Sequence, residues 1–545
     1  MSLLEDELKD HDDEARHCKM HDIIHDLAQL VGGTECSIIT THPKISNEKI
    51  RHVSVFRSVL PEDFISKIKV QISEFLCNTK KLRTLYSHLP VERKETVIDL
   101  LANLKHLRIL ILSESEFDSL PSSIGSLLHL RYLDLSMNRR IRRLPRSICK
   151  LQNLQTLRLY ACVQLEEFPK DTWKIATLRH LEITSKQEFL PKKGIEFLTS
   201  LRSLSIHKCY RLSTLVRGMQ HWTALQKLSL TDCPRLSSLE FDLNSLISLE
   251  TLEICNCSVL DLSGHLKKKE EDSLKGRRSL PSLIAGVNYR KEDRREQNEG
   301  GEKKEEDQQG LQKLRSLTFD QLPRLIELPS ELKNAARSLQ CLSISNCNNL
   351  FSLPDWLPQC TALKKLEIMK CKMLSSPPPP RSLLSQLAGV NYRKEDKREQ
   401  NEGGEKKEEG QQGLQKLRSL TFDQLPRLIE LPSELKNAAR SLQCLSISNC
   451  NSLSSLPDWL PQCTALKKLE IMKCRKLSSP PGSQDGKDYE VRYIMISPSQ
   501  GPFFPCFIFA SSYIDASSIF IYWFLTLQFF SFIACHCLHY HVIFS

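Results

Sequence analysis

Leucines recur along this chain in the phrase L-x-x-L-x-x-L-x-L, which returns every 23 or 24 residues between about residues 82 and 477. The phrase is clear at Leu104, Leu107, Leu110 and Leu112. In an extended segment alternate side chains point to opposite faces, so the leucines of each phrase share one buried face. Each period therefore predicts one short strand, followed by a turn or short helix that returns the chain to the next strand.

A single unit of this size cannot bury its own leucines, so neighbouring units must stack and share a continuous core. The phrase and its period are typical of leucine-rich repeats. We therefore predict an α/β solenoid, a leucine-rich-repeat horseshoe with a parallel sheet on its concave side. Three residues after many of the phrases stands Asn138 or a cysteine, whose side chain we expect to turn inward and bond the backbone. These cysteines are Cys162, Cys209, Cys233, Cys257, Cys347, Cys371, Cys450 and Cys474.

Two highly charged segments with few apolar residues interrupt the leucine register. They cannot bury enough surface to offset the entropy of ordering the chain, so we expect both to be disordered insertions. The expected segments after the N-terminal region are a connector (34–80), repeats (81–264), a charged insertion (265–310), repeats (311–376), a second insertion (377–413), repeats (414–480), a linker (481–501) and a hydrophobic tail (502–545).

A long internal duplication links the two insertions and the repeats that follow them. Residues 286–378 recur at 389–481 with six differences and no gap. Since this offset of 103 residues is not a multiple of the repeat period, we expect the insertion to absorb the misfit. Unequal exchange within the gene explains the duplication, and a sequence-assembly artefact is the alternative.

The tail is apolar enough to raise the question of a membrane. Residues 516–538 carry no Asp, Glu, Lys or Arg and are long enough to cross a bilayer as a helix. No basic flank sets an orientation, and the composition is poor in leucine. A C-terminal membrane anchor and read-through into non-coding sequence both remain open.

The net charge of +11 is distributed through repeats in which Lys and Arg alternate with Asp and Glu. This mixture indicates solvated faces, so we expect no nucleic-acid partner. The chain starts with acidic residues and has no secretory signal pattern, which predicts a reducing, cytoplasmic location.

Near the N-terminus, the string CKMHDIIHDLA contains Met20, His21 and Asp22, and its apolar residues recur at helical spacing through Val31. RHVS at 51–54 and LPSSIGSLLHLRYLDLS at 120–136 add two further motifs. Together these motifs resemble the plant intracellular NB-ARC leucine-rich-repeat disease resistance proteins of the coiled-coil class. The resemblance implies that residues 1–33 are a remnant of the winged-helix segment that ends the NB-ARC module. It also implies an ADP-phosphate contact for His21.

No G-x-x-x-x-G-K-[ST] motif occurs in the chain, so no phosphate-binding loop is available. We therefore expect no ATPase activity and no bound cofactor, ADP and ATP included, and we interpret His21 as vestigial. His21 and His25 also have the spacing of zinc-binding helices, but Asp22 replaces the glutamate base and no third ligand is apparent. We expect neither a metal site nor any other enzymatic centre.

The residues between the leucines of each phrase face the concave side, and they form the candidate binding surface. The family resemblance implies a role in plant defence, with a pathogen effector, a guarded host protein or a full-length receptor as the partner. A stand-alone adaptor or scaffold and a non-functional pseudogene product are the alternatives. The candidate residues are Arg131, Tyr132, Asp134, Arg158, Tyr160, Arg179, His180, Glu182, His207, Lys227, Arg315, Asp320, Lys364, Lys365 and Glu367.

Overall fold

A computed structural model describes most of the repeats. All described residues belong to one compact unit, Met1–Ile496. The tail, His21 and nearly all of both charged insertions lie outside the described residues. The predictions made for those segments therefore stay predictions. The described residues are 4–6, 18–20, 33, 35–39, 49–55, 79–87, 104–116, 118–190, 194–215, 217–262, 310–376, 413–477 and 494–495.

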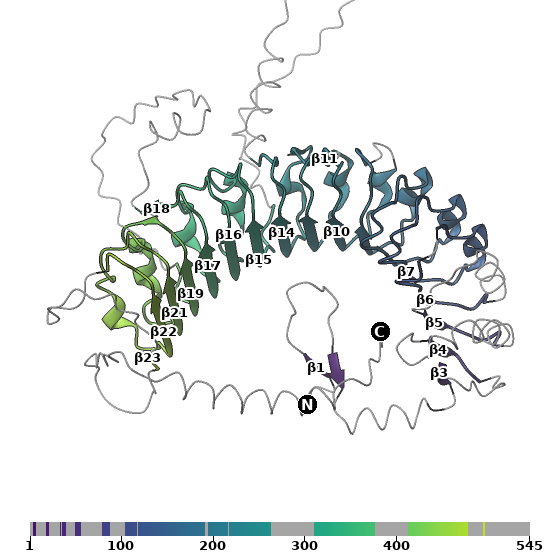
Figure 1. The fold of residues 1–545 in the computed structure, drawn as a ribbon, viewed down its shortest axis with the longest axis horizontal. Coiled ribbons are helices and arrows are strands. Elements are labelled where there is room, and N and C mark those ends of the chain that lie inside the picture. The colour runs from purple at the N-terminus through teal and green to yellow at the C-terminus, as the bar shows by residue number, and fades with distance from the viewer. Residues whose placement is uncertain are drawn as a thin grey trace, which may run out of the picture. The chain divides into compact units, whose positions relative to one another are not determined.

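Sixteen parallel strands, one from each described repeat or connector segment, form a single curved sheet that lines the inner side of the solenoid (Figure 1). This confirms the predicted leucine-rich-repeat horseshoe. The strands are β3 (Cys36–Ile39), β4 (His52–Val55), β5 (Thr84–Ser87), β6 (Ile109–Ile111), β7 (Tyr132–Asp134), β8 (Thr156–Leu159), β9 (His180–Ile183), β10 (Ser203–His207), β12 (Lys227–Thr231), β14 (Thr251–Cys255), β15 (Ser316–Asp320), β16 (Cys341–Ser345), β17 (Lys365–Met369), β19 (Ser419–Asp423), β21 (Cys444–Ser448) and β22 (Lys468–Met472).

The sheet keeps its register across both charged insertions. Thr251 of β14 pairs with Ser316 of β15, and the leucines that follow them pair as well. Across the second insertion, Lys365 of β17 pairs with Ser419 of β19. Each insertion therefore leaves and re-enters the solenoid at the same point of the repeat, so the leucine core is not shifted by the 103-residue offset.

The outer side of the solenoid carries short 3-10 helices (Figure 1). Five of them follow a proline directly, which stands at the N-cap with an extended ψ and lacks an N–H that the helix would not use. Among the described residues the helical part of the predicted α/β fold thus consists of 3-10 turns. They are η2 (Ser122–Ser126), η3 (Arg146–Lys150), η4 (Lys170–Lys174), η5 (Ile195–Phe197), η6 (Arg217–His221), η7 (Leu243–Ser245), η8 (Ser330–Ala335), η9 (Leu357–Gln359), η10 (Ser433–Ala438) and η11 (Leu460–Gln462).

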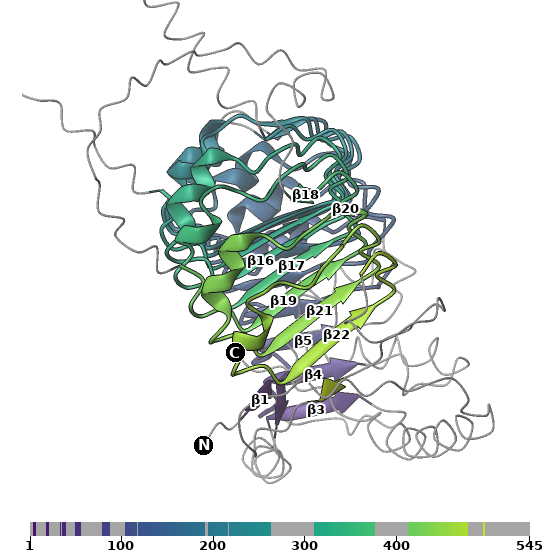
Figure 2. The same ribbon diagram turned by 90° about the vertical axis from the view of Figure 1, so that its left-hand side faces the viewer.

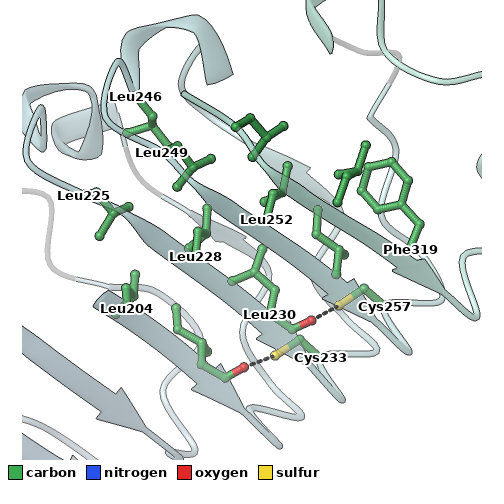
Figure 3. Packing of buried hydrophobic residues seen from close by; sticks show 14 of the residues in the cluster. Leu204, Leu225, Leu228, Leu230, Cys233, Leu246, Leu249, Leu252, Cys257 and Phe319 are labelled. Atoms are coloured by element: carbon green, nitrogen blue, oxygen red, sulfur yellow. Dashed lines mark hydrogen bonds between the residues drawn. The ribbon is translucent and has the colours of Figure 1, made fainter. Parts of the chain in front are cut away.

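The leucine core runs without interruption between the sheet and these turns, and the inward cysteines close it on one side. Figure 3 shows Leu204, Leu228 and Leu252 stacked on the successive strands β10, β12 and β14, and all three are fully buried. In the same view the Sγ of Cys257 donates to the carbonyl of Leu230, at 3.8 Å. Asn138 has the same role, since its Nδ2 donates to the carbonyl of Leu112 at 2.7 Å. The predicted inward turn residues are confirmed.

Smaller elements complete the described structure. Cys18–Met20 forms strand β2, which pairs antiparallel with β1 (Leu4–Asp6). Residues 23–31, on which the expected helix rests, lie outside the described residues, so that helix stays a prediction. No helix among the described segments is long and apolar enough to cross a membrane. The remaining strands are β11 (Thr214–Leu215), β13 (Ser238–Leu239), β18 (Ser375–Ser376), β20 (Arg427–Leu428) and β23 (Ile494–Met495).

Candidate recognition surface on the concave sheet

The inner face of the sheet is largely polar because most strands alternate residues of the leucine core with polar residues that face the concave side. In β8, Leu157 and Leu159 are buried in the core, while Arg158 between them is only partly buried. Strand pairing aligns the residue between the two buried positions from repeat to repeat, so Asp134, Arg158 and Glu182 are direct neighbours on β7, β8 and β9. The leucine spacing thus sets which polar residues meet on this face.

A chain of charges crosses β7 to β9 at this row. The Arg158 guanidinium lies between two carboxylates: its Nε donates to Glu182 Oε2 at 2.6 Å, and its Nη1 lies 3.6 Å from Asp134 Oδ2. The side chains of Arg158, Asp134 and Glu182 are 25%, 8% and 12% exposed. Because these three side chains are well shielded from water, their ion pairs are held in one geometry more firmly than a surface ion pair.

Aromatic and cationic groups at the ends of β8 and β10 extend this chain of charges. His207 Nε2 lies 3.6 Å from Glu182 Oε1, and the His207 ring packs edge-on against Tyr160, with centroids 5.5 Å apart. Lys208 places its Nζ 5.3 Å from the centroid of the Tyr160 ring, a cation–π contact. The Lys208 amine also donates to the Tyr160 hydroxyl at 3.4 Å. We call Asp134, Arg158, Glu182, Tyr160, His207 and Lys208 the central network.

The electrostatics of the central network fix the charge of its arginine. Burial lowers the pKa of Arg158, but the carboxylates of Glu182 and Asp134 raise it by more, so the net shift is upward. Beside it, burial and the negative charge of Asp134 raise the pKa of the Tyr132 hydroxyl. Arg158 therefore stays protonated and Tyr132 stays neutral over the physiological range.

The other predicted residues near this network lie along its margin. Arg131 and Arg179 precede their strands and are exposed. His180 is exposed on β9, and its pKa is lowered by burial of part of the ring and by the nearby charges of Arg202 and Arg179. His180 is thus neutral at physiological pH, whereas the arginines around it form a positive edge. Lys227 on β12 is partly buried.

The predicted residues of the C-terminal repeats form a separate group. Arg315 Nη1 lies 3.8 Å from Glu250 Oε2, and Lys365 Nζ lies 2.9 Å from Glu367 Oε1. Asp320 accepts hydrogen bonds from Ser345 Oγ at 2.5 Å and from Asn346 Nδ2 at 2.7 Å. Lys364 Nζ donates to Gln340 Oε1 at 2.9 Å. The structure therefore divides the predicted face into a central part on β7–β10 and a C-terminal part from β15 onward.

Sequence reasoning missed several polar residues of this face. Lys208 directly follows β10, at a position with a left-handed φ of 54° that recurs after most strands. Extending the pattern by two residues beyond the last buried position would have found Lys208. Glu253, which accepts a hydrogen bond from Ser229 Oγ at 3.1 Å, occupies the same row as Arg158 and was also missed.

The described surface has features of a protein-binding face. The network pairs its ions internally, and no group of His, Cys, Asp and Glu in the described ranges could hold a metal ion. What the network offers a partner is a rigid arrangement of one aromatic ring, fixed charges and donors. Aromatic and arginine side chains of this kind are enriched where protein interfaces derive most of their binding free energy.

Comparisons with known proteins agree with the repeat architecture. A model described as a leucine-rich repeat region matches residues 87–291, and a leucine-rich repeat model matches 338–360 and 441–463. The chain is 37% identical over 149 residues to "Putative disease resistance protein At3g14460" of Arabidopsis thaliana, covering 27% of this chain and 10% of that protein. It is 34% identical over 124 residues to "Putative disease resistance protein RGA1" of Solanum bulbocastanum, covering 23% and 9%. The matches thus span about a tenth of the length of these curated relatives.

Solved structures to which the chain is similar include the Leptospira interrogans LRR protein LIC12759, with a TM-score of 0.49 and 20% identity over 78% of this chain and 85% of that chain. Another is a chain of the Toll–Spatzle complex of Drosophila, with a TM-score of 0.42 and 14% identity over 77% and 51%. The stacked parallel strands, the buried leucine phrase and the matched repeats identify the described fold as a leucine-rich-repeat solenoid, in a chain similar to plant proteins named for disease resistance.

Proposed function

We propose that this chain is the protein-recognition region of a plant defence protein, and that the concave sheet binds a pathogen effector or a host protein. The observation that carries the proposal is the central network on β7–β10. Its charged groups are largely shielded and already paired, so a partner meets a surface that needs little ordering on binding. The similarity to disease resistance proteins supports the biological context.

In this proposal the residues of the chain contact protein and not nucleotide. The sequence holds no G-x-x-x-x-G-K-[ST] loop, so we assign no nucleotide switch to it. His21 lies outside the described residues, and its implied contact with ADP stays a hypothesis. A role as a stand-alone adaptor uses the same face, and the two roles differ in whether the partner is tied to infection.

Site-specific photo-crosslinking tests the proposed surface. A photo-reactive amino acid replaces Arg131, next to the central network, or Arg146, an exposed arginine of η3 on the outer side. Each variant is incubated with leaf extract from pathogen-challenged and from unchallenged plants. We expect a discrete crosslinked protein from position 131 in the challenged extract, and its loss when Tyr160→Ala removes the ring between His207 and Lys208.

Crosslinking from position 146 is the control that distinguishes recognition by the concave face from non-specific binding. The same crosslinked bands from positions 131 and 146, or a band at 131 that Tyr160→Ala leaves unchanged, would contradict binding by the central network. A discrete band of equal intensity in both extracts would instead favour the adaptor role.

A further inference from the structure

The duplication gives the C-terminal part of the sheet the same inner surface twice. β15, β16 and β17 have the same sequences as β19, β21 and β22, and the differences between the copies lie outside these strands. Both copies continue one sheet in one register, because β17 pairs with β19. Figure 2 shows β16, β17, β19, β21 and β22 side by side on this face.

The side-chain contacts are duplicated along with the sequence. The Lys365–Glu367 ion pair at 2.9 Å recurs as Lys468–Glu470 at 2.8 Å. The Asn346 amide donates to Asp320 at 2.7 Å, and Asn449 donates to Asp423 at 2.8 Å. The two copies therefore present the same charges in the same orientation.

Each copy carries a pair of adjacent lysines at the start of its third strand. Lys364 precedes β17, is exposed and has no ion-pair partner among the described residues. Lys365, the first residue of β17, is paired with Glu367. We call Lys364 and Lys365 cationic cluster 1, and the equivalent residues Lys467 and Lys468 cationic cluster 2.

The spacing of the two clusters decides what kind of ligand can use both. Three strand steps separate β17 from β22, which amounts to about 14 Å at the usual distance between strands. Two folded partners cannot sit side by side at that separation, because a small domain is about 30 Å across. An extended polypeptide covers the same distance in about four residues.

We propose that the two cationic clusters form one composite site for an extended acidic polypeptide segment whose acidic groups recur about every four residues. The segment runs across the strands, and each acidic group lies over one cluster. The proposal concerns β15–β22 and goes beyond recognition at the central network, although both rest on polypeptide binding by the concave face. The duplication then enlarges one site instead of creating two.

The duplication itself supplies the test variant. Removal of residues 311–413 joins Gly310 to Leu414, restores the local sequence, and places β19 where β15 pairs with β14. The Asn334–Asn244 hydrogen bond at this junction can re-form through Asn437, the equivalent residue of the second copy. A second variant, Lys467→Ala, removes the exposed charge of cluster 2 that has no ion-pair partner among the described residues, and leaves the chain at full length.

Fluorescence anisotropy with synthetic peptides gives the readout. One peptide carries a single Glu-Glu pair, one carries two pairs about four residues apart, and a third carries two adjacent pairs. For the intact chain we expect the correctly spaced peptide to bind at least ~10-fold more tightly than the single-pair peptide, by effective concentration. Both variants should lose this gain and keep the single-pair affinity within about twofold.

Three results would overturn the proposal. They are equal binding of the adjacent-pair peptide, a gain that survives in both variants, and the same gain for a single-stranded RNA of equal charge, which would indicate a general polyanion site. Position 131 precedes the excised residues 311–413 in the chain, so the excision leaves the central network in place. If the photo-crosslink from position 131 persists in the excised chain while the peptide results fail, this proposal fails and the central recognition surface stands.

Discussion

Leu133→Asp unfolds the repeats around β7. Leu133 is fully buried in the continuous core between the leucines of β6 and β8. A carboxylate at this position has no counter-charge and no room for water, so we expect a loss of about 4 kcal/mol or more in the free energy of unfolding. Because each repeat is stabilised by its neighbours, the damage spreads along the solenoid. Urea denaturation followed by circular dichroism measures the effect.

Leu128→Asp is the matched control for this substitution. Leu128 belongs to the same repeat, but it is 55% exposed. The same chemical change there should shift the free energy of unfolding by no more than about 0.5 kcal/mol. Equal unfolding midpoints for the two variants would show that the leucine phrase does not form a dry core.

Arg158→Met should destabilise the protein by roughly 3 kcal/mol, because it leaves two shielded carboxylates, one on each side of position 158, without their cation. Asp134 and Glu182 are 8% and 12% exposed, so water cannot replace the guanidinium fully. Adding Glu182→Gln to the variant removes one of the two negative charges and should recover part of the loss. The two unfolding free energies, measured by urea titration at neutral pH, form the test.

Arg143→Met provides the comparison. Arg143 pairs with Glu166 at 3.4 Å, and these side chains are 74% and 41% exposed. Loss of such a pair should cost less than about 1 kcal/mol. If Arg158→Met were as mild as Arg143→Met, the central network would be an ordinary solvated surface, and its rigidity could not support the proposed recognition.

The leucine phrase alone predicted the fold, because its period sets both the strand spacing and the buried face. The same logic predicted the inward position of Asn138 and the cysteines, which the hydrogen bonds to Leu112 and Leu230 confirm. It could not predict the strand at residues 18–20, which lie outside the leucine phrase and form a strand by pairing with β1. Short segments of this kind are decided by their partners and not by their own pattern.

The candidate surface was predictable as a face but not as a network. Every residue between two buried leucines could be assigned to the concave side, which placed Arg158 and Glu182 correctly. Which of them form contacts depends on side-chain reach across neighbouring strands: Arg158 spans two strands, while Arg131 points to no described carboxylate. Lys208 was missed because it follows the strand, and its position over Tyr160 depends on a left-handed backbone turn.

Hydrogen–deuterium exchange of the intact chain, with and without the crosslinked partner, tests the central claim that one uninterrupted concave sheet is the recognition surface. Without the partner, we expect slow exchange in β14, β15, β17 and β19 alike, because their backbone pairing continues across both insertions. With the partner, added protection should concentrate on β7–β10. Fast exchange in β15 or β19, or added protection confined to the outer 3-10 turns, would contradict the account.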